Sequence, residues 1–195
     1  MQTIWALLAI WFVALAGTVA AESSAEIRER RPDLFHPESG LRIDRHRAPV
    51  PQDVPLPAQR VSALKAKRLM ARGAVVLDVY GAAQSRYDEL DGTWLVHGPR
   101  QSLPGATWLP EVGRGVLEPA MASYLEREME RLTEGAKARA VIVFCVADCW
   151  MSWNAAQRIA GLGYLRVYWL RNGTDGWREL GWPLEPVLPV PVTLD

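Results

Sequence analysis

Apolar and polar positions along the chain form short apolar runs and longer amphipathic segments. Two apolar, β-branched runs, AVVLDVY at 74–80 and AVIVF at 140–144, predict buried strands, and 106–109 and 165–170 predict two more. Apolar residues bounded by proline and glycine predict helices over 61–72, 118–134, 152–162 and 174–180. Because strands alternate with helices, the sequence predicts the α/β class, with a central parallel sheet and helices on both faces. In such sheets, functional sites lie where strands end and helices begin.

The first 58 residues do not share this alternation. Residues 4–21 carry no charge and end in small residues, with Val19 and Ala21 placed for cleavage before Glu22. This pattern predicts a secretory signal peptide over 1–21. Since the run is also just long enough to cross a bilayer, an uncleaved membrane anchor is the alternative. Residues 22–58 are polar and then proline-rich, which predicts an extended segment. The expected organisation continues with a single domain over 59–188 and a tail over 189–195.

Composition narrows the function classes. The chain has 22 basic and 22 acidic side chains, so its net charge of zero gives no electrostatic reason to expect a nucleic-acid partner. An apolar fraction of 49% excludes a disordered chain. The two cysteines exclude a disulfide-dense scaffold and a four-thiolate zinc site. In an exported chain, both cysteines meet an oxidising compartment.

Both cysteines lie in one loop, CVADCWMS, between the predicted strand 140–144 and the helix that follows it. Cys145 ends the strand, and Ser152 is expected to cap the helix. The backbone N–H groups and the dipole at a helix N-terminus favour a thiolate or a bound anion, which is the setting that a nucleophilic cysteine requires. The alternative is a buried cysteine without a chemical role. We predict a catalytic pair, Cys145 and Cys149, and a ligand-binding loop formed by Val146, Ala147, Asp148, Trp150, Met151 and Ser152.

Four segments, in order, resemble the rhodanese-like domain family. They are VVLDVY with its aspartate, SLPGATWLP, IVFC with the loop and helix that follow, and GTDGWRELGWPLE near the end. The resemblance covers about residues 61–186 and implies a single rhodanese-like domain. It also implies that Cys145 accepts a sulfane sulfur as a persulfide, while loop amides and a basic side chain hold the anionic donor.

A wider set of segments resembles the rhodanese-related proteins with a CXXCW motif that are associated with pyrroloquinoline-quinone (PQQ)-dependent catabolism. The segments are RAPVP at 47–51, LDVY at 77–80, RQSLPGATWLP, GRGVLEP, ADCWMSWNAA and GTDGW. Three residues separate the cysteines here, whereas the name of the motif has two. The likeness implies an exported, periplasmic accessory protein. Its partners are then periplasmic components of PQQ-dependent alcohol oxidation, and membrane attachment is expected only if the leader stays uncleaved.

Departures from the rhodanese pattern bear on the substrate. The loop is one residue longer than usual, a length that resembles the rhodanese-fold phosphatases and arsenate reductases. Those enzymes end the loop with an arginine that grips an oxyanion, where this chain has Met151, or Trp150 in the shorter alignment. Asp148 is expected to repel anions, and Tyr80 replaces a common arginine. These differences argue against phosphatase activity and against efficient thiosulfate sulfurtransfer. Arg100 and Arg114 are candidates for the missing cation, and the alternative is that both are simply solvated.

Cys149 has three candidate uses. It can resolve a reaction begun by Cys145, giving sulfur transfer or disulfide exchange, or it can form a permanent disulfide that staples the loop. The third use is a thiol metal site with Asp148 and His97, although the ligand spacing matches no established metal pattern. Trp150 can wall a site for a planar ligand such as PQQ. Two functions therefore stay open: a thiol enzyme, and a non-catalytic binding module for a redox cofactor or partner protein.

Overall fold

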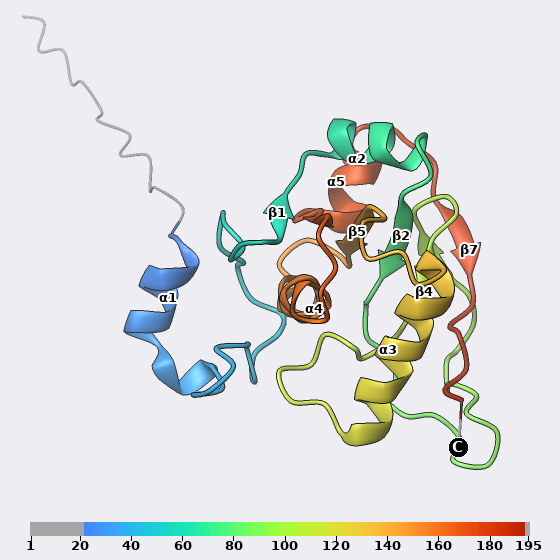
Figure 1. Ribbon diagram of the computed structural model, residues 1–195, viewed down its shortest axis with the longest axis horizontal. Coiled ribbons are helices and arrows are strands. Elements are labelled where there is room, and N and C mark those ends of the chain that lie inside the picture. The colour runs from blue at the N-terminus through green and yellow to red at the C-terminus, as the bar shows by residue number, and fades with distance from the viewer. Residues whose placement is uncertain (1–21, 194–195) are drawn as a thin grey trace, which may run out of the picture.

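The computed structural model describes residues 22–193, so the leader predicted over 1–21 lies outside the described residues. Its centre is a five-stranded parallel sheet with the order β1-β6-β5-β2-β4 (Figure 1). The strands are β1 (Gln59–Arg60), β2 (Val75–Asp78), β4 (Thr107–Trp108), β5 (Val141–Phe144) and β6 (Val167–Trp169). A separate antiparallel pair consists of β3 (Arg100–Ser102) and β7 (Glu185–Val187). The predicted α/β class with a central parallel sheet is confirmed.

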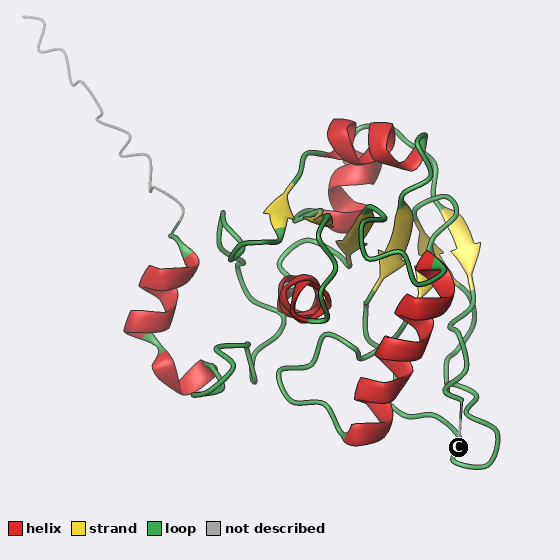
Figure 2. Ribbon diagram, in the orientation of Figure 1, coloured by secondary structure: helices red, strands yellow, loops and turns green. Residues whose placement is uncertain are grey.

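Helices cover both faces of the sheet (Figure 2). α2 (Ala63–Met70) and α5 (Gly173–Glu179) lie on one face, and α3 (Pro119–Thr133) and α4 (Trp150–Gly161) lie on the other. Successive side chains of a strand point to opposite faces, which divides the core in two. In β2, Val75 and Leu77 join the core beneath α3 and α4, whereas Val76 joins the core beneath α2. All of β2 is buried, as its apolar run predicts.

The strand order places a crevice at the carboxyl ends of β2 and β5. These two strands pair directly, with Asp78 opposite Phe144. From β2 the chain continues to β4 on one side, and from β5 it continues to β6 on the other. Ligands bind at such a reversal, because the two connections leave in opposite directions and open a gap between them. The turn after β2 and the cysteine loop after β5 both lie at this point.

The segment 22–58 has more structure than its sequence predicted. α1 (Ser24–Arg30) begins at a capping box, in which the Ser23 hydroxyl accepts from the Glu26 N–H and the Glu26 carboxylate accepts from the Ser23 N–H. A 3-10 turn, η1 (Pro32–Leu34), follows. The prediction of an extended segment without a helix was therefore wrong here. α1 is only 7 residues long, which is too short for a helical period to show in the sequence.

Both ends of the described chain pack onto the domain. Phe35 and Val50 are each 4% exposed and belong to the core cluster that contains α3 and α4. At the other end, Trp94 Nε1 and the Tyr124 hydroxyl both donate to the Val190 carbonyl, at 2.9 and 2.6 Å. Within residues 22–193, no helix is both long and apolar enough to cross a membrane.

Candidate active site

The segment 42–54, here called the strap, crosses the cysteine loop and pairs with it. Ala48 N–H donates to the Asp148 carbonyl at 3.1 Å, and Trp150 N–H donates to a strap carbonyl at 2.8 Å. These bonds form an antiparallel bridge in which Arg47 lies opposite Cys149. The loop that carries both cysteines is therefore held by a segment that comes much earlier in the chain.

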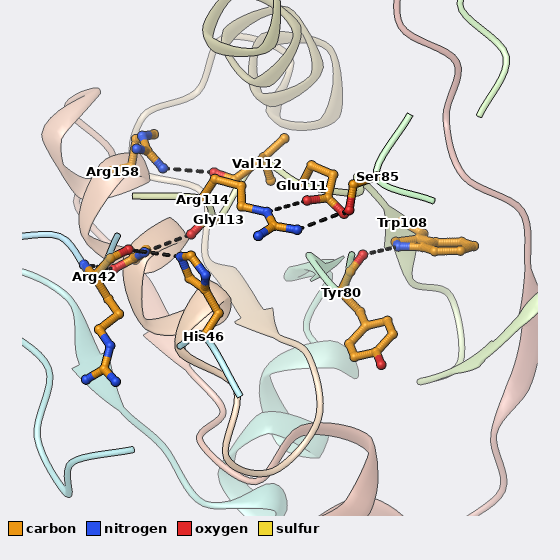
Figure 3. Close-up of polar contacts among 11 residues, drawn as sticks. Arg42, His46, Tyr80, Ser85, Trp108, Glu111, Val112, Gly113, Arg114 and Arg158 are labelled. Atoms are coloured by element: carbon orange, nitrogen blue, oxygen red, sulfur yellow. Dashed lines mark hydrogen bonds and ion pairs between the residues drawn. The ribbon is translucent and has the colours of Figure 1, made fainter. Parts of the chain in front are cut away.

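Asn154 on α4 anchors the strap. Its side chain is fully buried. Oδ1 accepts from the Arg42 N–H at 2.9 Å, and Nδ2 donates to the carbonyls of Arg42 and Gly113, both at 2.8 Å. The His46 ring also bonds the Arg42 carbonyl at 3.0 Å (Figure 3). Gly113 is required at this crossing, because a Cβ there would lie 2.2 Å from the Met151 carbonyl oxygen. One side chain thus ties the strap and α4 to the loop that precedes α3.

A cavity of about 750 Å³ opens between the strap, the turn after β2 and the loop that precedes α3. Cys149 and Met151 contribute to its wall. The charged residues of the lining are Arg45, Arg47, Arg114, Asp44 and Glu111. Among the described residues that line this cavity, Cys149 is the only cysteine.

One wall of the cavity is a fixed polar cluster (Figure 3). Buried Glu111 accepts from Arg114 Nε at 2.5 Å and from the Ser85 hydroxyl at 3.0 Å, and Arg114 Nη2 donates to the same hydroxyl at 3.0 Å. Gly81 leaves room for the carboxylate, since a Cβ at Gly81 would lie 2.5 Å from Glu111 Oε1. The cluster gives this wall both signs of charge in fixed positions.

Cys149 is the more acidic of the two thiols. Its pKa is lowered from its ordinary value of 9.0 to about 7. The largest cause is the adjacent Cys145 side chain, and burial opposes this effect. The Met151 N–H and the Arg47 guanidinium lower the pKa further. Arg47 also donates to the Ala147 carbonyl at 3.3 Å, which holds it over the loop. A thiolate that lines a cavity is the state that a nucleophilic cysteine requires.

Cys145 differs from Cys149 in its surroundings and in the direction of its pKa shift. It is fully buried, its thiol donates to the Ser152 hydroxyl oxygen at 3.2 Å, and its sulfur lies 3.4 Å from the Cys149 carbonyl oxygen. Burial raises the pKa of Cys145 well above its ordinary value, and the adjacent Cys149 sulfur raises it further. We expected the N-terminus of the helix to lower the pKa of Cys145. The structure lowers the pKa of Cys149 instead.

α4 begins at Trp150, earlier than predicted, so the prediction that Ser152 caps this helix is wrong. Cys149 occupies the cap position and makes no side-chain capping bond. Ser152 is buried in the first turn, where its hydroxyl donates to the Cys149 carbonyl at 3.2 Å and accepts from Trp169 Nε1 at 3.0 Å. Because the Cys145 thiol bonds to the same hydroxyl, Ser152 fixes the position of that thiol.

Trp150 packs beneath the strap. Its indole is fully buried and stands edge-on to Phe35 at 5.7 Å and to Trp153 at 5.0 Å, measured between ring centroids. The Arg42 guanidinium lies over its ring at 4.6 Å. The expectation that Trp150 walls a site for a planar ligand such as PQQ does not hold, because this indole is enclosed by core residues and by the strap.

The remaining residues of the predicted ligand-binding loop do not share one site. Ala147 N–H donates to the Asp175 carboxylate at 2.9 Å, so this amide is already occupied and does not face an anion. Asp148 is exposed and has a left-handed backbone conformation, with φ at 51°. Val146 lines a second cavity, of about 610 Å³, which shares Tyr80 with the first. Of the residues in the cysteine loop, Cys149 and Met151 line the first cavity, the one of about 750 Å³ that also contains Arg47.

Both arginines that we considered for the missing cation are ion-paired. Arg114 bonds Glu111, and Arg100 Nε donates to Asp78 at 2.7 Å. Asp78 is fully buried and also accepts from the Ser102 hydroxyl at 2.6 Å, so its role is that of a structural hydrogen-bond partner. The cation that acts on Cys149 is Arg47. The sequence interpretation did not name Arg47 as a site residue, although it begins the RAPVP segment.

The predicted metal alternative would bring His97 to the cysteines. His97 instead lines the second cavity, together with Arg100 and Trp108. In the part of the chain that the structure describes, no group of three or more histidine, cysteine, aspartate or glutamate side chains is placed to hold a metal ion.

The family is decided by comparison with known proteins. The rhodanese-like domain family matches residues 62–180, which is more than half of the chain. The chain belongs to the rhodanese-like domain family. No curated protein matches it.

This rhodanese-like domain is also similar to solved structures. The Alr3790 protein from Anabaena sp. is 18% identical with a TM-score of 0.42, and the match covers 65% of this chain and 80% of that one. A thiosulfate sulfurtransferase from Pseudomonas aeruginosa is 25% identical with a TM-score of 0.46, over 70% of this chain and 22% of that one. The polysulfide-sulfur transferase homodimer from Wolinella succinogenes is 14% identical with a TM-score of 0.42, and the match covers 65% of this chain and 77% of that one.

The two thiols of this rhodanese-like domain are expected to differ sharply in alkylation. The rate at which iodoacetamide modifies Cys149 should rise with pH and reach half its maximum near the pKa of about 7, because only the thiolate reacts. Cys145 should stay unmodified in the native protein, since its pKa is raised and its thiol does not line the cavity. In the Arg47→Gln variant, the half-maximum should move to higher pH, because a cation that favours the thiolate is lost.

Peptide mapping of the alkylated protein measures both sites. Arg68→Gln, which removes an exposed charge from α2, is the matched control and should leave the profile unchanged. Equal alkylation of both cysteines, or a wild-type half-maximum near 9, would contradict the assignment of the thiolate to Cys149.

Proposed function

We propose that this rhodanese-like domain takes up sulfane sulfur as a persulfide on Cys149. The observation that carries the proposal is the position of Cys149, which lines the arginine-containing cavity with its pKa lowered to about 7. Cys145, the cysteine that the family resemblance favoured, is fully buried with its thiol bonded to Ser152. The thiolate is the nucleophile in sulfur chemistry, so Cys149 is the better candidate for the attack.

The proposed step is a displacement at sulfur. The Cys149 thiolate attacks the outer sulfur of an anionic donor, either an organic persulfide or thiosulfate. A sulfur–sulfur bond to Cys149 forms as the donor's own sulfur–sulfur bond breaks, and the remainder of the donor leaves as a thiolate or as sulfite. Arg47 lies on the cavity wall, where it offsets the negative charge of donor and leaving group.

The cavity favours an organic persulfide over thiosulfate. Its volume of about 750 Å³ exceeds what a small dianion fills. The Glu111–Arg114 wall suits a donor that carries an ammonium group as well as an acid, such as cysteine persulfide. Loop amides that would otherwise cradle an oxyanion are occupied, that of Ala147 by Asp175 and that of Trp150 by the strap. This agrees with the sequence-based argument against efficient thiosulfate transfer.

Mass spectrometry of the reduced protein after exposure to cysteine persulfide tests the proposal. The Cys145→Ser variant isolates the uptake step and is expected to gain one sulfur atom, which peptide mapping should locate on Cys149. The Cys149→Ser variant is expected to gain none. Sulfur carried by Cys145 in the Cys149→Ser variant, at the rate of the wild type, would overturn the assignment.

The contact between the two cysteines supports a second candidate, thiol–disulfide exchange. Here Cys149 attacks a partner disulfide, and Cys145 resolves the mixed disulfide. A faster reaction of the reduced protein with a peptide disulfide than with cysteine persulfide would favour exchange over sulfur uptake. The non-catalytic alternative, a permanent Cys145–Cys149 staple, makes a different prediction. It requires a disulfide that resists mild reductants and a double serine variant that keeps partner binding.

The proposed setting is the periplasm, in association with PQQ-dependent alcohol oxidation. Its support is the uncharged leader over 1–21 and the segments RAPVP and ADCWMSWNAA of the wider family resemblance. A strain that carries Cys149→Ser is expected to lose growth on alcohol and to keep growth on a carbon source that needs no quinone enzyme. Cell fractionation and the intact mass would report export and cleavage of the leader. Normal growth on alcohol would remove this setting, while the sulfur chemistry is judged by mass spectrometry alone.

A further inference from the structure

The Cys145 thiol does not line the cavity, yet it lies directly against Cys149. Its sulfur is 3.4 Å from the Cys149 carbonyl oxygen and 3.2 Å from the Ser152 hydroxyl oxygen. Asp148, which lies in the turn between the two cysteines, has a left-handed backbone conformation with φ at 51°. The chain has no third cysteine. The only other thiol of the protein is therefore enclosed beside the residue that is proposed to carry the sulfur.

We propose that Cys145 is a resolving thiol that discharges the Cys149 persulfide as hydrosulfide, so that the protein reduces sulfane sulfur to sulfide. This inference rests on the proposed function, because it starts from the persulfide on Cys149.

The atoms and electrons of this step balance between Cys145, the Cys149 persulfide and one external reductant. The Cys145 sulfur attacks the Cys149 sulfur of the persulfide, and a Cys145–Cys149 bond forms as the bond from Cys149 to the outer sulfur breaks. The outer sulfur leaves with the electron pair of that bond and takes up the Cys145 proton, so it departs as HS⁻. Two thiol sulfurs are oxidised to a disulfide, and the sulfane sulfur is reduced to sulfide. An external dithiol then restores both thiols by exchange.

The surroundings of Cys145 suit this role. The Ser152 hydroxyl accepts from the Cys145 thiol and donates to the Cys149 carbonyl, which holds the thiol against its target residue. Cys149 is only 1% exposed, so an external sulfur acceptor has to enter the cavity that the departing donor occupies. Cys145 is already in place and needs no such entry, which favours the internal reaction.

A sulfur balance over a single turnover tests the inference. The reduced full-length protein receives one equivalent of cysteine persulfide labelled with heavy sulfur at the outer position, with no added thiol. The wild type is expected to release one labelled sulfide per chain and to become two hydrogens lighter. The Cys145→Ser variant is expected to keep the labelled sulfur on Cys149 and to release no sulfide. Ser152→Ala, which keeps both cysteines, is expected to release sulfide more slowly for each sulfur atom that it takes up.

The outcomes separate this inference from the proposed function. A wild-type chain that keeps the labelled persulfide and releases no sulfide would overturn the resolving role of Cys145 and leave sulfur uptake intact. No label on the protein and no labelled sulfide, in the wild type and in Cys145→Ser alike, would overturn both. Circular dichroism checks that Cys145→Ser is folded, and Cys145→Ala is the second variant, for which the same retained label is expected.

Discussion

Replacement of Asn154 by alanine is expected to release the strap and to make Cys149 less acidic. The substitution removes all three hydrogen bonds between this side chain and the backbone of Arg42 and Gly113. The Arg42 carbonyl keeps its bond to the His46 ring, so the Arg42 N–H and the Gly113 carbonyl are the groups left unpaired. Each costs about 1–3 kcal/mol, so the free energy of unfolding should fall by about 2–6 kcal/mol. Because the strap carries Arg47, its release should raise the pKa of Cys149 above about 7. At neutral pH, fewer chains would then carry the thiolate, and sulfur uptake should slow.

Denaturant unfolding and the pH profile of Cys149 alkylation measure the two effects. Gln157→Ala on the same helix is the control, because its amide makes only an intrahelical bond to the Trp153 carbonyl, at 3.2 Å. It should change stability by no more than about 0.5 kcal/mol. Limited proteolysis should cut the strap of Asn154→Ala faster than that of the wild type. An unchanged alkylation profile in a folded Asn154→Ala protein would show that the strap does not act on Cys149.

The Asp78→Asn variant is expected to be destabilised by about 3–5 kcal/mol, the range for breaking a buried ion pair from one side. The Asp78 carboxylate is fully buried at the end of β2 and accepts from Arg100 at 2.7 Å, from Ser102 at 2.6 Å and from the Tyr80 N–H at 3.0 Å. Burial raises the pKa of this carboxyl group, and the ion pair with Arg100 opposes the change. The amide keeps the size of the side chain but leaves the Arg100 guanidinium, only 13% exposed, without its counterion.

Urea unfolding of Asp78→Asn measures this effect, with Asp91→Asn as the control at an exposed turn whose amide can keep the bond to the Thr93 N–H. The double variant Asp78→Asn, Arg100→Met should recover part of the lost stability, because it removes the unpaired charge as well. A double variant that is less stable than Asp78→Asn would contradict the account based on an unpaired guanidinium.

The long elements of the fold were predictable from the sequence. The helix predicted over 118–134 is α3 (Pro119–Thr133), and the apolar runs at 74–80 and 140–144 contain β2 and β5. Three short strands were not predicted. β1 consists of two exposed residues, and β3 and β7 have three residues each, so none offers an apolar period. Their positions depend on pairing with distant strands, which a local pattern does not encode.

The candidate site was predictable in its place and not in its chemistry. The predicted order of a strand, a loop with two cysteines and a helix is present, and Cys149 of this loop lines a cavity. Which cysteine faces the cavity depends on the start of α4 at Trp150 and on the burial of Cys145, and both are properties of the folded chain. The role of Arg47 depends on a bridge to Cys149 across about a hundred residues of sequence. The polar, proline-rich composition of the strap gave no indication of that contact.

The strap has a consequence for any attempt to move this chemistry to another protein. The family match begins at residue 62, whereas the strap begins at residue 42 and supplies Arg47 to Cys149. A graft of the cysteine loop alone would carry both thiols and leave behind the arginine that helps to ionise one of them. A chain trimmed to the family boundary would also uncover Trp150, which lies beneath Phe35 and Arg42. The smallest transferable unit is therefore two segments that are distant in sequence, exchanged together with Asn154.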